Sequence, residues 1–430
     1  MATFGRLNLQ EVGYNFFAMP ILAPEPTAVI VTPRWKRTLY VLFVGQLFTA
    51  VGFASIFPFL PLYVEDLGAT SGMSIEFLAG MVYSGQAFTM MIASPIWGAL
   101  ADRYGRKLMV ERAMFGGSVI LLLMAFAQSA EQLVLLRAIQ GLITGTIAAA
   151  NAMVASIVPR HRVGYAMGLL QVGLGAGVAL GPLIGGALAD AYGYSTAFYA
   201  TAALLFLSGV LVWWGAEEHF VPSALENPGR ERFAARYRGV LSASGVPLTY
   251  SLHFLSQLGR STILPIAPLF IAVLLVDQRW LNTFTGLVVG VASITTTLSA
   301  SYLGRLGDRI GHQRIIVVSA LAGTLFYLFQ SRVSAAWQLL ALQALVGVAL
   351  GGIIPSISAL LARFTRPNEA GAVYGLDNSI DAAGRALAPM LGSAVAVWFG
   401  MRAAFIAAAL LFLLLCLLAV RRMPAPSEDR

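Results

Sequence analysis

Charge is scarce in this sequence. Only 11% of its 430 residues are Asp, Glu, Lys or Arg, whereas 58% are hydrophobic, and the mean hydropathy is +0.77. A soluble globular domain usually carries about 25% charged residues. The charged side chains are too few to cover a surface exposed to water, so most of the chain must face lipid.

Cysteine is scarcer still, since Cys416 is the only one. A single thiol excludes a disulfide within the chain and any cysteine-based zinc spacing. The sequence also lacks the G-x-x-x-x-G-K-[ST] pattern that cradles nucleotide phosphates, so ATP is not the expected energy source. The first 33 residues lack the order of a signal peptide, in which basic, apolar and cleavage regions follow one another. We therefore expect no metal, no cofactor, and a cytoplasmic tail at residues 1–34.

Long apolar runs are abundant instead. Stretches such as "TLYVLFVGQLFTAVGFASIFPFLPLYV" exceed the roughly 20 residues that a helix needs to cross a bilayer. The sequence predicts twelve spans, at about 38–64, 75–100, 108–128, 131–153, 163–189, 194–215, 244–276, 281–305, 313–330, 337–362, 369–399 and 401–420. The longest loop between spans, 216–243, separates a bundle at 35–215 from a bundle at 244–420, and a tail follows at 421–430.

Basic side chains are unevenly shared between the two sides of this predicted membrane protein. Most of the Lys and Arg outside the spans fall on one side, and only Arg279, Arg332 and Arg402 fall on the other. In membrane proteins the cytoplasmic loops carry the excess of Lys and Arg. We therefore expect both termini in the cytoplasm, and we attribute the pI of 9.8 to orientation rather than to nucleic-acid binding.

The two predicted bundles share a sequence repeat. Identical residues recur at one constant separation in the pairs Gly98 and Gly304, Asp102 and Asp308, Arg103 and Arg309, Gly105 and Gly311, Gly141 and Gly347, and Gly145 and Gly351. At a separation one residue longer follow Gly168 and Gly375, Gly177 and Gly384, Pro182 and Pro389, Gly185 and Gly392, Gly193 and Gly400, and Phe198 and Phe405. Such duplication is typical of transporters whose halves move about a central site.

Charges crowd between apolar spans in "GALADRYGRK", residues 98–107, and in its counterpart "GRLGDRIGHQR", residues 304–314. We expect Gly98 to let its helix pack closely and Gly105 to permit a turn that a Cβ would hinder. Asp102 is expected against a neighbouring helix N-terminus, where the helix dipole favours a negative charge.

One such loop in each half would act as a breakable latch in which Arg103 and Arg106 pair with acids. The alternative is an ordinary basic turn that only sets topology. The predicted gating residues are Gly98, Asp102, Arg103, Gly105, Arg106, Gly304, Asp308, Arg309 and Gly311.

Three of these stretches resemble motifs of the major facilitator superfamily. "GALADRYGRK" is similar to its loop motif, "RAIQGLITG" at 137–145 to its span 4 motif, and "GLGAGVALGPLIGG" at 173–186 to the span 5 motif of its antiporters. The resemblance covers roughly residues 35–420 and is closest to the twelve-span drug:proton antiporter group, which includes bacterial multidrug exporters. It implies an all-α membrane fold of two six-helix bundles related by a pseudo-two-fold axis. It also implies a part in proton transfer or gating for Arg137.

The span 5 motif has physical consequences of its own. Gly173, Gly177 and Gly181 are four residues apart, so they form one small-residue stripe that allows close helix contact. Pro182 removes a backbone hydrogen bond and can kink the helix. We expect this span to seal a leak path between the halves. The predicted antiporter motif comprises Gly173, Gly177, Gly181, Pro182, Gly185 and Gly186.

Ionisable residues inside the spans are few, and each costs roughly 2.5–3.5 kcal/mol on insertion scales, so they indicate function. Asp377, Asp381 and Arg385 are four residues apart and form one polar stripe expected to face the central cavity. We expect Asp381 to be ionised when paired with Arg385 and protonated when separated from it, with Asp377 as a relay. The alternative is a structural ion pair that only neutralises Arg385.

The family resemblance does not supply this coupling site. Many relatives use an acidic residue in span 1 or span 4. In this chain span 1 has only Gln46 midway, and span 4 has no acid. The predicted proton-coupling residues are Asp381, Asp377, Arg385 and Arg137. For Arg137 the alternative is an arginine that only bonds to the backbone.

Sparse polar groups among aromatic side chains predict a broad amphipathic cavity suited to lipophilic ligands. The residues expected to line it are Gln46, Tyr83, Gln86, Gln140, Gln171, His253, Gln257 and Arg260. For His253 we favour a packed polar side chain over a ligand contact.

These features predict a secondary active transporter that exports amphipathic small molecules across the cytoplasmic membrane in exchange for protons by alternating access. The alternative is the same fold exporting a sugar or translocating a lipid, because the charges at 369–399 suit a zwitterion or an anion as well as a cation. A polytopic enzyme or receptor is a remote alternative, since the histidines and Cys416 form no catalytic or metal group. The expected partners are a small-molecule substrate, protons and bilayer lipids, with no nucleic acid, and the expected state is a monomer.

Overall fold

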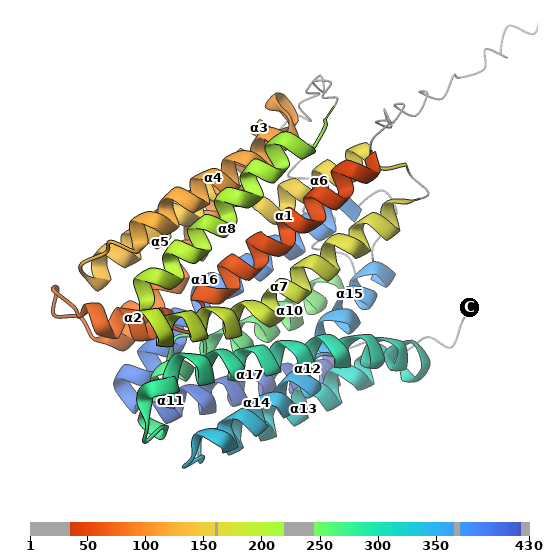
Figure 1. Cartoon of the computed structure of the whole chain (residues 1–430). Coiled ribbons are helices and arrows are strands. Elements are labelled where there is room, and N and C mark those ends of the chain that lie inside the picture. The colour runs from red at the N-terminus through yellow and green to blue at the C-terminus, as the bar shows by residue number, and fades with distance from the viewer. Residues whose placement is uncertain (1–34, 160–161, 219–244, 365–369, 423–430) are drawn as a thin grey trace, which may run out of the picture.

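The computed structural model describes residues 35–159, 162–218, 245–364 and 370–422, and helices are the only regular secondary structure within these ranges (Figure 1). The first half comprises α1 (Trp35–Ile56), α2 (Leu60–Leu67), α3 (Ile75–Tyr104), α4 (Arg106–Met124), α5 (Ala130–Ile143), α6 (Thr146–Ile157), α7 (Val163–Tyr192) and α8 (Tyr194–Gly215). The second comprises α10 (Val246–Thr262), α11 (Ile266–Leu274), the short turn η2 (Gln278–Trp280), α12 (Leu281–Ile310), α13 (His312–Gln330), α14 (Ala336–Leu350), α15 (Ile353–Phe364), α16 (Ala370–Phe399) and α17 (Met401–Arg422).

Each predicted span corresponds to one helix or to two consecutive helices. In the described part of the chain, nine helical segments are long and apolar enough to cross a membrane by length and composition. The predicted N-terminal tail and most of the predicted inter-bundle loop lie outside the described residues, as does the predicted tail at 421–430 apart from its first two residues, which belong to α17.

Proline breaks the first span of each half at corresponding places. The chain leaves the helix at Pro58 between α1 and α2, and at Pro265 between α10 and α11. Proline has no backbone N–H and clashes with the preceding turn, so a helix that reaches it ends or bends. Each half therefore turns at the same depth, which supports the predicted duplication.

The two halves meet through reciprocal contacts. A Cβ added to Gly80 of α3 would meet the carbonyl oxygen of Pro389 on α16, and one added to Gly286 of α12 would meet that of Pro182 on α7. Gly80 and Gly286 occupy equivalent positions in the repeat, as do Pro389 and Pro182. α3 therefore packs on α16 as α12 packs on α7, which is the arrangement expected of two bundles related by a pseudo-two-fold axis.

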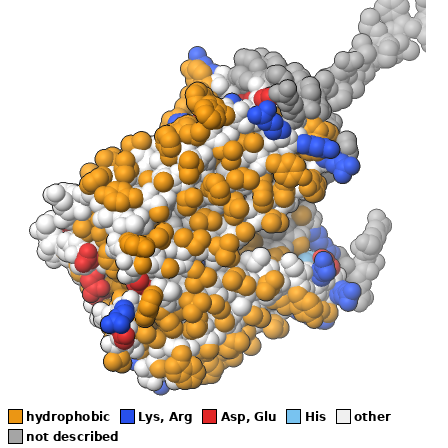
Figure 2. Space-filling view, viewed as in Figure 1, with side chains coloured by type: hydrophobic (Ala, Val, Ile, Leu, Met, Phe, Trp, Pro, Cys, Tyr) orange, Lys and Arg blue, Asp and Glu red, His pale blue; other side chains and the backbone are white. Residues whose placement is uncertain are grey.

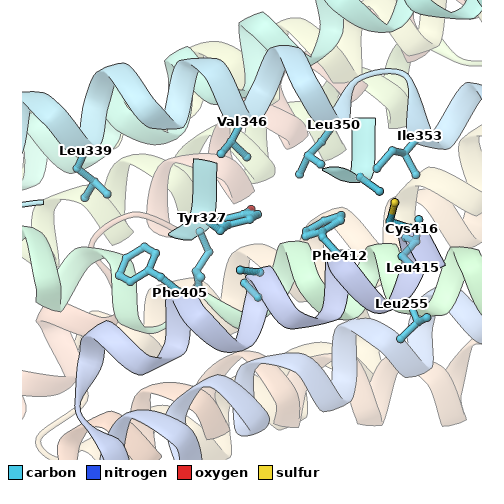
Figure 3. Close-up of a cluster of buried hydrophobic side chains, with 14 of the residues drawn as sticks. Leu255, Tyr327, Leu339, Val346, Leu350, Ile353, Phe405, Phe412, Leu415 and Cys416 are labelled. Atoms are coloured by element: carbon cyan, nitrogen blue, oxygen red, sulfur yellow. The ribbon is translucent and has the colours of Figure 1, made fainter. Parts of the chain in front are cut away.

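Each half has its own apolar core. Figure 3 shows the core of the second half, where Tyr327 of α13 stacks on Phe412 of α17 with ring centroids 5.6 Å apart. In the first half Phe59 meets Phe198 edge to face at 5.7 Å. Aromatic pairs of this kind add about 0.5–1.5 kcal/mol beyond area burial.

The halves are in contact at one end and apart at the other. We call the end that contains α2 and α11 the closed end, and the opposite end, where α1 begins, the open end (Figure 1). The close contacts of Gly80 and Gly286 lie toward the closed end, whereas Gly98, Gly164 and Gly168, toward the open end, face open space. Figure 2 shows a notch in the surface between the halves at the open end, where Lys and Arg side chains gather.

Exposed polar side chains deep within the helices support this opening. Gln171 of α7 and Asn378, Ser379 and Arg385 of α16 are exposed, although each lies two turns or more from the end of its helix. Polar groups at membrane depth are tolerated where they face a water-filled cavity rather than lipid.

Candidate functional site

An ionisable cluster lies between α10 and α16 in the second half. His253 Nδ1 is 2.7 Å from Asp377 Oδ1, and His253 Nε2 is 3.7 Å from Asp381 Oδ1. The other oxygen of Asp381, Oδ2, accepts a charge-assisted contact of 2.8 Å from Arg385 Nη2. We call His253, Asp377, Asp381 and Arg385 the ionisable cluster. It joins the two predicted coupling acids through a histidine that the sequence suggested mainly as a packed side chain.

Two anchors hold α10 against α16 on either side of this cluster. Tyr250 donates a hydrogen bond of 2.9 Å from its hydroxyl to the carbonyl oxygen of Val373. One turn beyond the acids, Gly384 leaves just enough room for the Gln257 side chain. Because Asp377 and Asp381 are four residues apart, they project from the same face of α16, and His253 meets both.

The predicted polar stripe therefore faces α10 as well as the space between the halves. The side chains of Asp377 and Asp381 are 16% and 18% exposed, whereas that of Arg385 is 46% exposed. Arg260, two turns from His253 on α10, lies close enough to Asp381 and Arg385 to interact electrostatically with both. The cluster is thus shielded at its acids and open at its arginine.

Arg137 forms a separate polar cluster in the first half. It is completely buried on α5, its Nη1 donates to Gln140 Oε1 at 2.6 Å, and its Nε donates to the Val82 carbonyl at 3.3 Å. Its guanidinium also lies 5.6 Å from the centroid of the Phe57 ring. Among the described residues, Arg137 Nη2 and Gln140 Nε2 have no hydrogen-bond partner.

The remaining predicted cavity residues are divided between packed and open positions. Gln46, Tyr83, Gln140 and Gln257 are buried, and two of them have partners besides the Arg137–Gln140 pair given above. The Tyr83 hydroxyl donates to the Phe57 carbonyl, and Gln257 Nε2 donates to Ser261 Oγ at 3.1 Å. Gln86 and Arg260 are half-buried, and Gln171 is exposed. Their contact with a substrate stays a prediction.

The span 5 motif packs largely inside the first half. A Cβ on Gly173, Gly177 or Gly181 would meet Phe43, Ala50 or Ala54 of α1, respectively, so this stripe seals α7 against α1. Its contacts with the other half come later along the helix. There Pro182 meets Gly286, and Gly186 meets the backbone of Asn282. The stripe therefore makes the close helix contact that its spacing predicts, and it makes it within its own half.

The gating loop differs from its prediction at one point. Gly105 and Gly311 do adopt φ of 99° and 97°, a backbone region that favours glycine. Gly98, however, is exposed with open space around it, because the halves are apart at this end. Glu218 caps the helix that follows, accepting bonds of 3.0 and 2.7 Å from the N–H groups of Arg106 and Lys107. The Asp102 side chain lies outside the described set.

The second-half loop is built differently. Asp308 is exposed and pairs with His312 Nε2 at 3.2 Å. Gln313 donates to the Ala419 carbonyl at 2.9 Å, in the position where Lys107 donates to the Trp213 carbonyl at 2.9 Å. Both loops are therefore tied to the last helix of their own half. Arg103 and Arg309 are exposed, and Gly304 lies beside Pro355.

Asp190 is a functional candidate that sequence reasoning missed. It lies near the end of α7 in the first half, yet its carboxylate accepts four hydrogen bonds from the start of α12 in the second. The donors are Asn282 N at 3.1 Å, Asn282 Nδ2 at 2.8 Å, Thr283 N at 2.7 Å and Thr283 Oγ1 at 2.6 Å. A carboxylate at a helix N-terminus satisfies free N–H groups and opposes the helix dipole. This contact locks the closed end, and only the partner helix, distant in sequence, reveals it.

Comparison with known sequences places these features in a family. A family model described as Major Facilitator Superfamily matches residues 42–247 and 249–430. Multidrug resistance protein MdtG of Serratia proteamaculans (strain 568) is 38% identical over 394 residues, which cover 91% of this chain and 94% of that protein. The protein of the same name from Salmonella typhimurium (strain LT2) is 37% identical over 375 residues, covering 86% of this chain and 92% of its own.

Solved structures agree on the fold. A bacterial homolog of the human lysosomal transporter Spinster, in an inward-facing and unoccupied conformation, has a TM-score of 0.74 at 14% identity, covering 92% of this chain and 100% of its own. The human organic anion transporter MFSD10 has a TM-score of 0.63 at 20% identity, covering 90% and 100%. At these identities the likeness concerns the fold alone.

Proposed function

Because the chain belongs to the major facilitator superfamily, we propose that it exports amphipathic small molecules in exchange for protons by alternating access. Membership of this family makes it a multi-pass transporter of the inner membrane with a small-molecule substrate, and not an enzyme. The multidrug resistance proteins named above support amphipathic drugs as the substrate class. Proton exchange and a monomeric state belong to the proposal.

The orientation is part of the same proposal. Lys and Arg side chains gather at the open end (Figure 2), and cytoplasmic loops carry the excess of such residues. We therefore assign the open end to the cytoplasm and the closed end, with Asp190, to the periplasm. Both termini then lie in the cytoplasm, and the conformation faces inward, ready to accept a molecule from that side.

The observation that carries proton coupling is the 2.8 Å pair between Asp381 and Arg385. It lies at membrane depth, next to the space between the halves. An ion pair there is stable only while both partners remain together, because an isolated charge in a low-dielectric site is costly. A substrate or a helix movement that draws Arg385 away would favour a protonated Asp381. Arg385 is the exposed member, so a substrate can reach it first.

The proposal is tested by Asp381→Asn in inside-out vesicles with an acidic lumen. Uptake is followed for ethidium, rhodamine B and anilinonaphthalene sulfonate, which are cationic, zwitterionic and anionic amphiphiles. We expect gradient-driven accumulation of at least one dye by the wild type, and a loss of at least about tenfold in the variant. Binding of that dye to the purified variant should persist.

Ser379→Ala is the matched control, because Ser379 is exposed on the same helix and its hydroxyl bonds only within the helix, to the Gly375 carbonyl. It should transport as the wild type does. Coupled transport that survives in Asp381→Asn would contradict the coupling role of Asp381. A wild type that accumulates no dye under any gradient would contradict the proposed export function.

A further inference from the structure

His253 is the only group that contacts both acids of the ionisable cluster within the described part of the chain. It is 8% exposed, and its two ring nitrogens face different carboxylates. Nδ1 lies 2.7 Å from Asp377 Oδ1, and Nε2 lies 3.7 Å from Asp381 Oδ1. The first distance is that of a short hydrogen bond, and the second exceeds hydrogen-bond range by less than 1 Å. A small displacement of α10 against α16 is enough to exchange which acid is bound.

The chemistry of imidazole limits how protons are arranged in this cluster. A neutral ring has one donor nitrogen and one acceptor nitrogen, whereas imidazolium has two donors. Two ionised carboxylates facing both nitrogens can be satisfied only by imidazolium. If the ring is neutral, a hydrogen bond at its acceptor nitrogen requires a protonated carboxyl group there. When both nitrogens are hydrogen-bonded to the acids, the three groups therefore share one proton in addition to that of the neutral ring.

Within the described ranges, the helices packed on α10 carry no acid or histidine besides Asp377 and Asp381. Among the described residues of the helices packed on α10, α16 contributes Asp377, Asp381 and Arg385. The Cys416 thiol of α17 points away from α10, toward the Val317 carbonyl of α13. The charged residues that remain lie toward helix ends: Arg363 on α15, and Arg402 and Arg421 on α17. On α10 itself, Arg260 lies two turns away, and Tyr250 is bonded to Val373.

The two acids also differ in depth. α16 begins at the open end, so Asp377 is one turn nearer to it than Asp381. Resting on the proton exchange proposed above, we propose that His253 carries the coupling proton between Asp381 and Asp377. The Asp381 carboxyl group gives its proton to Nε2, and Nδ1–H gives its proton to the Asp377 carboxylate. The summed charge of the three groups is unchanged, and the ring is left as its Nε2–H tautomer.

The test compares His253→Gln with the wild type in two assays on the same vesicles. Gln keeps a donor and an acceptor but cannot titrate, and the equivalent position of the first half already holds a glutamine, Gln46. The first assay is gradient-driven uptake of the dye that the wild type accumulates. The second is exchange of that dye across vesicles without a gradient, which needs alternating access but no net proton movement.

We expect His253→Gln to lose at least about tenfold of gradient-driven uptake and to retain exchange within about twofold. The exchange rate of the wild type should depend on pH, and that of the variant, which has no imidazole, should not. Ser251→Ala, an exposed residue on the same helix, should match the wild type in both assays.

The outcomes separate this inference from the proposed function. Coupled uptake in His253→Gln with an unchanged pH profile would overturn the inference while the proposed function stands. Equal loss of uptake and of exchange would assign His253 a structural role and overturn the inference as well. A wild type without gradient-driven uptake would overturn both.

Discussion

The two halves place different side chains at equivalent positions of the same scaffold. The second half has His253 on its first span and the stripe Asp377, Asp381 and Arg385 on its fifth. The equivalent residues of the first half are Gln46, Leu170, Leu174 and Val178. The backbone supports this correspondence, because Gly52 lies against Leu205 as Gly259 lies against Phe412.

This difference indicates that the two halves share a fold through duplication, and that substitutions at equivalent positions made only the second half ionisable there. In the first half, apolar stripe residues and the glycines of α7 allow tight packing on α1. In the second half, the same helix face carries charge and is packed less closely. The polar cluster that the first half does have, around Arg137, lies on α5 and contains no acid. The two halves thus offer matched pairs of positions at which one member is structural and the other ionisable.

The largest expected difference concerns the stripes of small residues. A Cβ on Gly177 would overlap Ala50 and the backbone N of Val51 on α1, whereas one on Gly384 would come no nearer than 3.0 Å to its nearest neighbours, Cβ and Cγ of Gln257. We expect Gly177→Ala to destabilise the protein by about 1–3 kcal/mol, and Gly384→Ala by less. Thermal unfolding in detergent measures both. Equal melting temperatures for the two variants would refute the difference in packing.

A smaller effect is expected at the closed end. Asp190 joins α7 to α12 through four hydrogen bonds, while the position equivalent to Asp190 beside α3 is Val397. Asp190→Asn should weaken this lock by about 1–2 kcal/mol, because the carboxylate's attraction to the helix N-terminus is lost. The population open at that end should rise, which is measured by distances between spin labels on α7 and α12. Val397→Ala is the control and should leave those distances unchanged.

The smallest effect is expected at the gating loops. Glu218 caps α4, whereas the equivalent sequence position of the second half is Ala425, which has no carboxylate. Glu218→Gln should cost about 0.3–1 kcal/mol, since the cap is partly exposed and the dipole interaction is screened by salt. The melting temperature should fall less in high salt than in low salt. A loss that does not depend on salt would contradict the charge–dipole origin.

Most of the fold could be predicted from the sequence, because each span can be recognised from its own hydropathy and the two halves from their repeated residues. The spans, the glycine turns at Gly105 and Gly311, and the small-residue stripe of α7 all follow from local spacing. Asp377, Asp381 and Arg385 were found for the same reason, because one helix carries all three.

What the sequence could not supply were contacts between helices distant in the chain. The link from His253 to both acids depends on how α10 packs on α16, and the cap on α12 depends on how α7 approaches it. Neither has a spacing signature. Glu218 was missed likewise, because it follows the last helix of the half and caps a helix far earlier in the chain. The open space around Gly98 reflects the conformation, which no single-chain pattern specifies.

The reciprocal contacts of Gly80 with Pro389 and of Gly286 with Pro182 have a consequence for the speed of the transport cycle. Gly286 meets a backbone carbonyl directly, and Gly80 meets the Pro389 carbonyl together with the short Ser393 side chain, so separating the surfaces requires little side-chain rearrangement. Little apolar area is exposed when such a contact opens, and the two end states can therefore remain close in free energy. About 5.5 kcal/mol is enough to exchange a 1:99 population for 99:1. Because these contacts consist largely of backbone, the binding of one ligand or one proton is enough to shift the protein between its two end states.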